Sequence, residues 1–220
     1  MKIKFSLLFL LLIFFGCSPV RMVKPLQKRQ QIVGSSFGGP LINFAGAPIP
    51  IPFTSLFYAN GITNNVTVIG GLNTTSLLFG NIHLDASSCI NLFYKENKYG
   101  ISLNPGVQSI YHIRDSKSFG LWPTLDLNGY FHFKNKSSFL YTGVNSWIEL
   151  KNQKAHGEKV TAPVLPSFQI GYQLVNTKWN HQFEIKYLGI GRSNQPNVVD
   201  YIGGAGQGAF GLFYGLHFKF

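Results

Sequence analysis

The sequence predicts an all-β protein, namely an antiparallel, up-and-down transmembrane β-barrel of eight to ten strands. Three observations support this class. Apolar and polar residues alternate with a period of two along many segments, which is the pattern of a β-strand with two different faces. Only 12% of the residues are charged, and the chain contains 24 glycines. Beyond residue 16, no apolar run approaches the ~20 residues of a transmembrane helix. Composition alone leaves a soluble β-sandwich as the alternative.

The first sixteen residues predict an export signal. Lys2 and Lys4 precede an unbroken apolar run over residues 5–15, which is too short to span a bilayer. The sequence Phe14-Phe15-Gly16-Cys17 that follows resembles the lipobox of bacterial lipoproteins. This resemblance implies that residues 1–16 are cleaved and that Cys17 carries a covalent lipid, with no other cofactor. Cys89 is then the one remaining thiol, so we expect no disulfide and a small apolar residue in a strand.

Residues 17–52 read as a lipidated basic tether followed by a Gly/Pro-rich segment. Arg21, Lys24, Lys28 and Arg29 crowd just beyond Cys17, where each charge near an anionic lipid surface contributes about 1 kcal/mol. Residue 18 is not the Asp associated with inner-membrane retention of lipoproteins. We therefore expect an outer-membrane protein with its lipid anchor at the periplasmic leaflet. Nucleic acid is a poor partner for an exported chain.

The barrel itself is expected over residues 53–220. Pro48, Pro50 and Pro52 remove donors from a β-ladder, which excludes a central strand there and leaves 34–52 along the barrel foot or in its lumen. Asn64-Asn65 suits a tight hairpin between 53–61 and 66–73. Residues 74–80 could be a bent connector, so the expected strand count is eight or ten.

Segment lengths distinguish a membrane barrel from a soluble one. Strands of about ten residues suit a tilted membrane strand, and alternation extends over 99–108, 125–134, 167–174 and 179–187. Connections alternate between short ones at 95–98, 134–136 and 176–177 and longer ones at 114–120, 151–163 and 192–206. Because outer-membrane barrels place short turns on the periplasmic side, we expect the last strand to end there.

The last strand carries the most specific signal. Its alternate residues are apolar and the chain ends on an aromatic residue; this face consists of Phe210, Leu212, Tyr214, Leu216, Phe218 and Phe220. The strand resembles the C-terminal targeting strand that the outer-membrane assembly machinery reads. With the Phe-Phe-Gly-Cys motif, it makes the chain similar to small barrel lipoproteins of Bacteroidota-type, Gram-negative outer membranes. That resemblance implies architecture and location but no activity.

Residues that could carry chemistry are scattered. The six histidines do not cluster, so no metal site is predicted. His83 and Asp85 lie close to Ser87 and Ser88, but without the strained turn of a nucleophile, and no catalytic site is predicted. Several polar residues point inward by alternation and are expected to form a lumen network, because a small barrel is filled by side chains; they are Asp126, His132, Lys134, Glu184, Lys186, His217 and Lys219. A narrow pore or ligand site is the alternative.

The sequence favours a non-enzymatic structural or accessory subunit of a larger outer-membrane complex. Its expected partners are outer-membrane lipids, the assembly machinery and other outer-membrane proteins. A barrel is firmly inserted already, so an added lipid would serve to position the tether rather than to anchor the chain. Two alternatives stay open: an outer-membrane enzyme that modifies lipids, and a narrow channel.

Overall fold

The structure, a computed structural model, describes residues 20–96, 98–114, 119–133, 137–152, 159–160, 162–194 and 199–220. The predicted signal peptide (1–16), Cys17 and Lys134 lie outside the described residues. Within this part of the chain, no helix is both long and apolar enough to cross a membrane.

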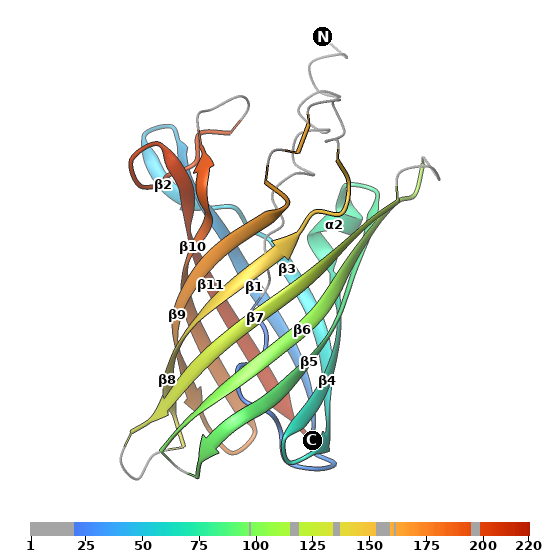
Figure 1. Cartoon of the computed structure of the whole chain (residues 1–220), viewed down its shortest axis with the longest axis vertical. Helices are drawn as coiled ribbons and strands as arrows, with labels where there is room; N and C mark the ends of the chain where they lie inside the picture. The colour runs from blue at the N-terminus through green and yellow to red at the C-terminus, as the bar shows by residue number, and fades with distance from the viewer. Residues whose placement is uncertain are drawn as a thin grey trace.

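Ten strands form one closed antiparallel barrel (Figure 1). Each pairs with its neighbours in the chain, and β11 pairs with β1 to close the sheet. The ten are β1 (Gln31–Phe44), β3 (Thr54–Thr63), β4 (Val66–Asn73), β5 (Asn81–Lys95), β6 (Tyr99–His112), β7 (Phe119–His132), β8 (Phe139–Ile148), β9 (Val164–Val175), β10 (Trp179–Ser193) and β11 (Gln207–Lys219). The predicted all-β barrel is confirmed, with the higher of the two expected strand counts.

The connections divide the barrel into two ends. The turns β3–β4, β5–β6, β7–β8 and β9–β10 lie at one end, which we call the short-turn end; the β3–β4 turn is the predicted Asn64-Asn65 hairpin. The opposite loop end carries the longer connections and the short helix α2 (Thr74–Leu78), capped by the Asn73 side chain. The C-terminus lies at the short-turn end (Figure 1), where the Phe220 amide donates to the Gln31 carbonyl.

The barrel begins earlier in the sequence than expected, so the predicted boundary at residue 53 is wrong. β1 pairs with β11 from Ile32 to Pro40 and with β3 from Gln31 to Phe37. The predicted exclusion of a central strand by Pro48, Pro50 and Pro52 therefore holds only for the residues that follow β1. Pro48 and Pro50 lie in β2 (Ala47–Pro50), which pairs with β1 alone as a hairpin extension at the loop end. An edge strand tolerates a proline because no second neighbour needs its missing donor.

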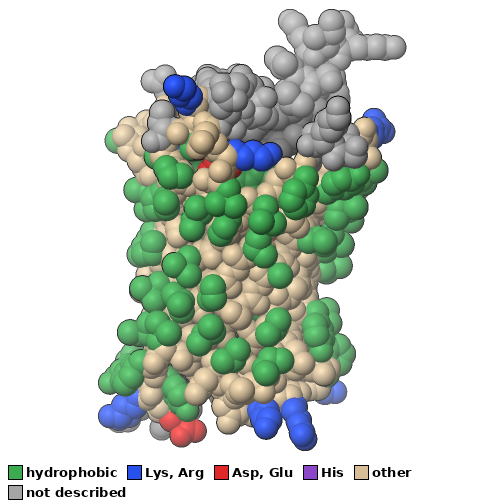
Figure 2. Space-filling model, turned by 45° about the vertical axis from the view of Figure 1, so that its right-hand side comes forward, with side chains coloured by type: hydrophobic (Ala, Val, Ile, Leu, Met, Phe, Trp, Pro, Cys, Tyr) green, Lys and Arg blue, Asp and Glu red, His purple; other side chains and the backbone are tan. Residues whose placement is uncertain are grey.

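The outer surface is apolar, as a bilayer requires. Hydrophobic side chains cover the wall between the two ends, and Lys and Arg lie at the ends (Figure 2). On β10, Phe183 and Ile185 are 50% and 52% exposed, whereas Glu184 and Lys186 are each 3% exposed. A soluble sandwich would bury the two apolar residues and expose the two charged ones. The alternation of β10 therefore favours the membrane barrel over the sandwich.

The core lies inside the barrel and is partly built from residues before β1. Met22 and Leu26 pack with wall residues in one cluster, and Val23 packs with aromatic residues of β7 and β8 in another. The wall members of the first cluster include Cys89, which is free and fully buried as expected. Residues 20–26, which we call the internal segment, thus fill part of the lumen.

Candidate functional site

The internal segment is held in the lumen by hydrogen bonds from wall side chains to its backbone. Asn104 Nδ2 donates to the Met22 carbonyl at 2.7 Å, and Ser102 Oγ donates to the Val23 carbonyl at 2.6 Å. The Leu26 amide donates to Thr67 Oγ1 at 2.8 Å. Side chains of the wall therefore satisfy backbone groups that a strand would pair with its neighbours, as buried backbone requires. Beyond Leu26 the chain turns at the short-turn end and enters β1 (Figure 1).

This placement corrects, from residue 20 onward, the expectation that residues 18–33 form a tether on the membrane surface. Arg21 and Lys24 lie inside the barrel, whereas Lys28 and Arg29 are exposed at the short-turn end. Headgroup attraction near a surface contributes only about 1 kcal/mol per charge. A nearly buried ion pair and three buried apolar side chains outweigh it, so the first half of the basic cluster turns inward.

Arg21 is the most completely bound charged side chain of the internal segment. Its Nε donates to Asp85 Oδ1 at 2.9 Å, and its Nη2 donates to Asp85 Oδ2 at 2.5 Å. Nη1 donates to Ser55 Oγ at 3.2 Å, and the guanidinium carbon lies 5.0 Å from the centre of the Phe57 ring. Ser55 is itself held by Ser36, with their hydroxyl oxygens 2.6 Å apart. This is a two-pronged carboxylate contact completed by a hydroxyl and an aromatic ring.

Lys24 lies nearer the short-turn end and has no carboxylate in direct contact. Its Nζ is 3.0 Å from His132 Nε2 and 5.9 Å from the centre of the Tyr130 ring. Burial lowers the pKa of the Lys24 ammonium, and the carboxylate of Glu96 opposes this change. The two cations of the segment are therefore held differently, and within the described residues Arg21, unlike Lys24, forms an ion pair with the wall.

A second polar group lies on the opposite wall and also contacts the segment. Lys186 Nζ lies 3.1 Å from Glu184 Oε2, and the Tyr141 hydroxyl donates to Glu184 Oε1 at 2.8 Å. Gln182 Nε2 is 2.7 Å from the Tyr141 hydroxyl oxygen and 3.1 Å from the Arg21 carbonyl oxygen, and can donate to both. This group connects β8 and β10 to the backbone of the internal segment.

The other residues of the predicted lumen network have different hydrogen-bond partners, and Asp126 also interacts electrostatically with Lys186 and Glu184. Asn145 Nδ2 donates to Asp126, and Lys219 Nζ donates to the Asn176 carbonyl at the short-turn end at 3.0 Å. His217 is fully buried, and neither of its ring nitrogens has a hydrogen-bond partner among the described residues. Sequence reasoning missed Arg21 and Ser55, because neither the basic cluster nor a lone serine signals a lumen contact.

The residues considered for catalysis are engaged separately. His83 Nε2 lies 2.7 Å from Gln108 Oε1, and Asp85 holds Arg21. Within the described residues, no hydrogen bond joins His83 to Asp85 or to Ser87. Over the same residues, no group of three or more His, Cys, Asp or Glu side chains could hold a metal ion.

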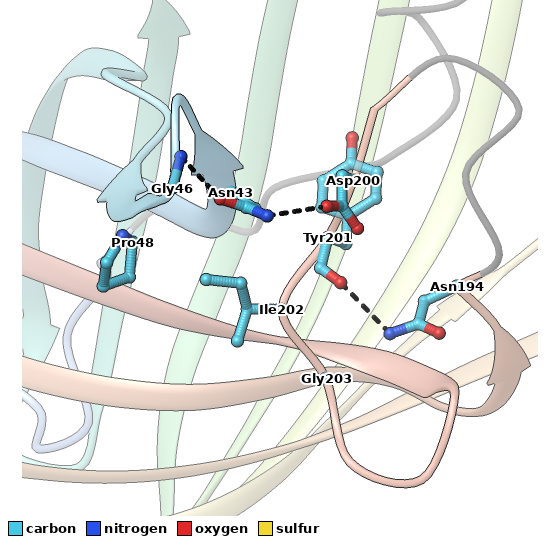
Figure 3. A pocket seen from close by; sticks show the side chains of 8 residues that line it. All are labelled: Asn43, Gly46, Pro48, Asn194, Asp200, Tyr201, Ile202 and Gly203. Carbon is cyan, nitrogen blue, oxygen red and sulfur yellow. Dashed lines mark hydrogen bonds between the residues drawn. The ribbon is translucent and has the colours of Figure 1, made fainter.

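The loop end carries a separate shallow pocket of about 590 Å³ between the β1–β2 hairpin and residues 200–203 (Figure 3). Asn43 joins the two sides of the pocket. Its backbone N–H donates to the Asp200 backbone carbonyl at 2.9 Å, and its side-chain Nδ2 donates to Asp200 Oδ2 at 3.1 Å. Asn194 Nδ2 donates to the Tyr201 carbonyl at 3.2 Å. The hairpin and the β10–β11 connection therefore form one connected rim.

Comparison with known proteins supports the fold. No family model matches the chain, and no curated protein matches its sequence. An outer membrane channel from Pseudomonas putida F1 is 10% identical, with 92% of this chain and 100% of that chain covered and a TM-score of 0.51. The NanC porin (12% identity, 87% and 100% covered, TM-score 0.44) and the outer membrane protein OprG from Pseudomonas aeruginosa (12%, 90% and 99%, 0.36) are more distant. At these identities the likeness concerns the fold alone, which is that of an outer-membrane β-barrel.

Proposed function

We propose that this protein is a narrow outer-membrane channel that its own internal segment holds closed. The observation that carries the proposal is which residues fill the lumen. Part of the lumen is occupied by residues 20–26, which belong to no strand and are joined to the wall covalently only through the turn into β1. Such a segment can leave without breaking any strand pair of the barrel, whereas wall side chains cannot.

The energetics of the internal segment are consistent with two states. Burial of Met22, Val23 and Leu26 contributes roughly 1.5–3 kcal/mol each, and each hydrogen bond to the wall contributes about 1 kcal/mol. Ordering the backbone costs about 1–2 kcal/mol for each residue of the segment. These opposing sums are of the same size, so a modest change in the contacts would shift the balance between closed and open.

The wall also offers more polar groups than the segment uses. Within the described residues, buried atoms without a hydrogen-bond partner include Asn104 Oδ1, Asn128 Nδ2, Gln182 Oε1 and both ring nitrogens of His217. Native interiors leave few such groups unpaired. A wall that faces water for part of the time has a reason to keep them, because water then satisfies them. These polar groups would be hydrated in an open lumen, so the wall is compatible with a channel.

Conductance in planar bilayers tests the proposal. A chain lacking residues 20–26 should conduct steadily, whereas the full chain without a lipid on Cys17 should be closed for most of the time. The double variant Lys28→Ala and Arg29→Ala, which removes two exposed cations in the turn that follows the segment, should behave like the full chain. If the shortened barrel is folded and does not conduct, the channel proposal is wrong.

A structural or accessory subunit of an outer-membrane complex is the second candidate, and the rim favours it. The β1–β2 hairpin extends beyond the part of β1 that pairs with β3 and β11. It carries Phe44 and Ile49, which are 63% and 38% exposed. An exposed apolar hairpin tied to a loop suits a protein partner. Native pull-down from outer membranes, with and without Phe44→Ser and Ile49→Ser, tests this role. A partner that the wild type captures and the variant loses would support it.

The remaining expectations belong to the same proposal. We propose a protein without catalytic function, since His83 and Asp85 are each engaged elsewhere. We further propose acylation of Cys17, anchoring at the periplasmic leaflet and recognition of the last strand by the assembly machinery. Kinship with Bacteroidota-type barrel lipoproteins rests on the resemblance of the motifs at the two ends.

A further inference from the structure

The contacts of Arg21 have the composition of a guanidinium-binding site. A guanidinium has five N–H donors in a fixed fork. The wall accepts three hydrogen bonds from this fork, two at Asp85 and one at Ser55, and Nη1 makes a fourth to the Val20 carbonyl at 3.0 Å. The Phe57 ring adds a cation–π contact. Every wall group of this set comes from a strand of the barrel, so the set persists when the segment leaves.

The backbone of the neighbouring strand leaves room for the ion pair between Arg21 and Asp85. Gly71 on β4 lies beside it, and a Cβ atom built there would overlap the carboxylate of Asp85 and approach Arg21 Nη2 to 2.6 Å. Any larger residue at position 71 would therefore displace the cation or its acceptor. Glycine in a strand interior often marks a place where a ligand or backbone approaches closely, and here the approaching group is a guanidinium.

The charge of the wall points to the same class of ligand. Lys95, Arg192 and Lys219 lie at or next to the ends of their strands. The charged residues farther along the described strands are three carboxylates (Asp85, Asp126 and Glu184) and one ammonium (Lys186), a formal charge of −2. The internal segment contributes Arg21 and Lys24, a formal charge of +2. When the segment leaves, the lumen is therefore left with an excess of negative charge, which attracts cations and repels anions.

We propose that Asp85, Ser55 and Phe57 form a binding site for guanidinium-bearing solutes, and that Arg21 occupies it in the closed state as a tethered ligand. The inference rests on the proposed channel, because a free solute reaches the site only when the segment moves. A solute with a guanidinium group could make the contacts that Arg21 makes with Asp85, Ser55 and Phe57. Such a solute would compete with Arg21 for the site and so oppose closure. We expect the open channel to pass it in preference to other solutes.

Isothermal titration of the full chain in detergent with L-arginine tests the site. Arg21→Ala should bind L-arginine at least tenfold more tightly than the wild type, because the tethered guanidinium acts at an effective concentration in the millimolar range. Adding Asp85→Asn to Arg21→Ala should remove that gain without leaving a charge unpaired. L-Citrulline, which carries a neutral urea group in place of the guanidinium, should not bind to any variant.

Matched controls separate the site from general loosening of the segment. Lys24→Ala removes the other cation of the segment and should show no gain in L-arginine binding, because Arg21 still fills the site. Heat-modifiable gel mobility verifies folding, and Arg21→Gln replaces Arg21→Ala if the latter is not folded. Equal binding of L-arginine and L-citrulline by the folded variant, no binding at all, or undiminished binding after Asp85→Asn would each overturn the proposal.

The outcome also distinguishes this inference from the channel on which it rests. If Arg21→Ala binds L-arginine while the chain lacking residues 20–26 does not conduct, the site is real and the channel proposal is wrong. If the shortened chain conducts but Arg21→Ala does not bind L-arginine, the channel stands and the guanidinium site is wrong. In a conducting barrel, L-arginine added at millimolar concentration should reduce the potassium current, and L-citrulline should not.

Discussion

The guanidinium of Arg21 and the carboxylate of Asp85 stand 64 residues apart in the sequence and meet at 2.5 Å inside the barrel. Both side chains are only 9% exposed. This contact joins a segment that precedes the first strand to β5 in the wall of the barrel. It is therefore both a structural restraint on the segment and the centre of the site proposed above.

Breaking this pair from one side should destabilise the closed state. Asp85→Ala leaves the Arg21 guanidinium without its carboxylate, and loss of one partner from a buried pair costs about 3–5 kcal/mol. Because the segment can leave the lumen instead, we expect most of the effect in a larger open fraction, measured as single-channel conductance. The exchange Arg21→Asp with Asp85→Arg should partly restore closure. Equal open fractions in Asp85→Ala and wild type would contradict the role of the pair.

The second buried pair should affect the stability of the barrel itself. Glu184→Ala removes the carboxylate that lies 3.1 Å from Lys186 Nζ and accepts from Tyr141, so a loss of about 3–5 kcal/mol is expected. Glu96→Ala, at an exposed acidic residue of the β5–β6 turn, should stay within about 0.5 kcal/mol of wild type. Urea unfolding in detergent measures both. A Glu184→Ala variant as stable as Glu96→Ala would count against a structural network in the lumen.

The parts of the fold that follow from local periodicity were predictable, and those that depend on distant contacts were not. A strand alternates strictly between two faces, so the pattern of residues 179–187 was enough to place Glu184 and Lys186 inside. β1 has no such pattern, because Gly34 lies against the Phe57 ring and Pro40 marks the start of the hairpin extension. The partner of Arg21 could not be predicted, because nothing near Asp85 in the sequence indicates a cation.

The closing strand supports a third prediction. Phe218 packs against Trp179 of the adjacent strand with ring centres 4.8 Å apart, and Phe220 packs on Phe218 at 5.3 Å. Changing both phenylalanines to Asp, or deleting Phe220, should abolish assembly and leave the chain in the periplasm. The direct cost of a charge on the lipid face near the rim is small, so lost recognition by the assembly machinery is the main effect expected. Heat-modifiable mobility of either variant in outer-membrane fractions would contradict this.

The last prediction joins the expected lipid on Cys17 to the state of the lumen. Val20 is fully buried, and a Cβ atom built at Gly215 of β11 would lie 2.9 Å from its Cγ1. Three residues span at most about 11 Å, and this length limits how far a lipid on Cys17 could lie from a segment held in the lumen. Acyl chains require hydrocarbon around them, and many side chains of the lumen wall are polar. We therefore expect acylation of Cys17 and the closed lumen to exclude one another.

Palmitate labelling and conductance together test this relationship. Wild-type protein from outer membranes should be labelled, and Cys17→Ala should not. The labelled protein should conduct, because its segment is withdrawn toward the short-turn end. The fourteen residue steps from Cys17 to Gln31 extend about 49 Å at most, so the lipid can reach the periplasmic leaflet. Cys17→Ala should be closed, since its segment is free to enter the lumen. Adding Asp85→Ala to Cys17→Ala should reopen it, because the segment then loses its ion pair. Identical conductance of labelled wild type and unlabelled Cys17→Ala would show that lipid and segment do not compete.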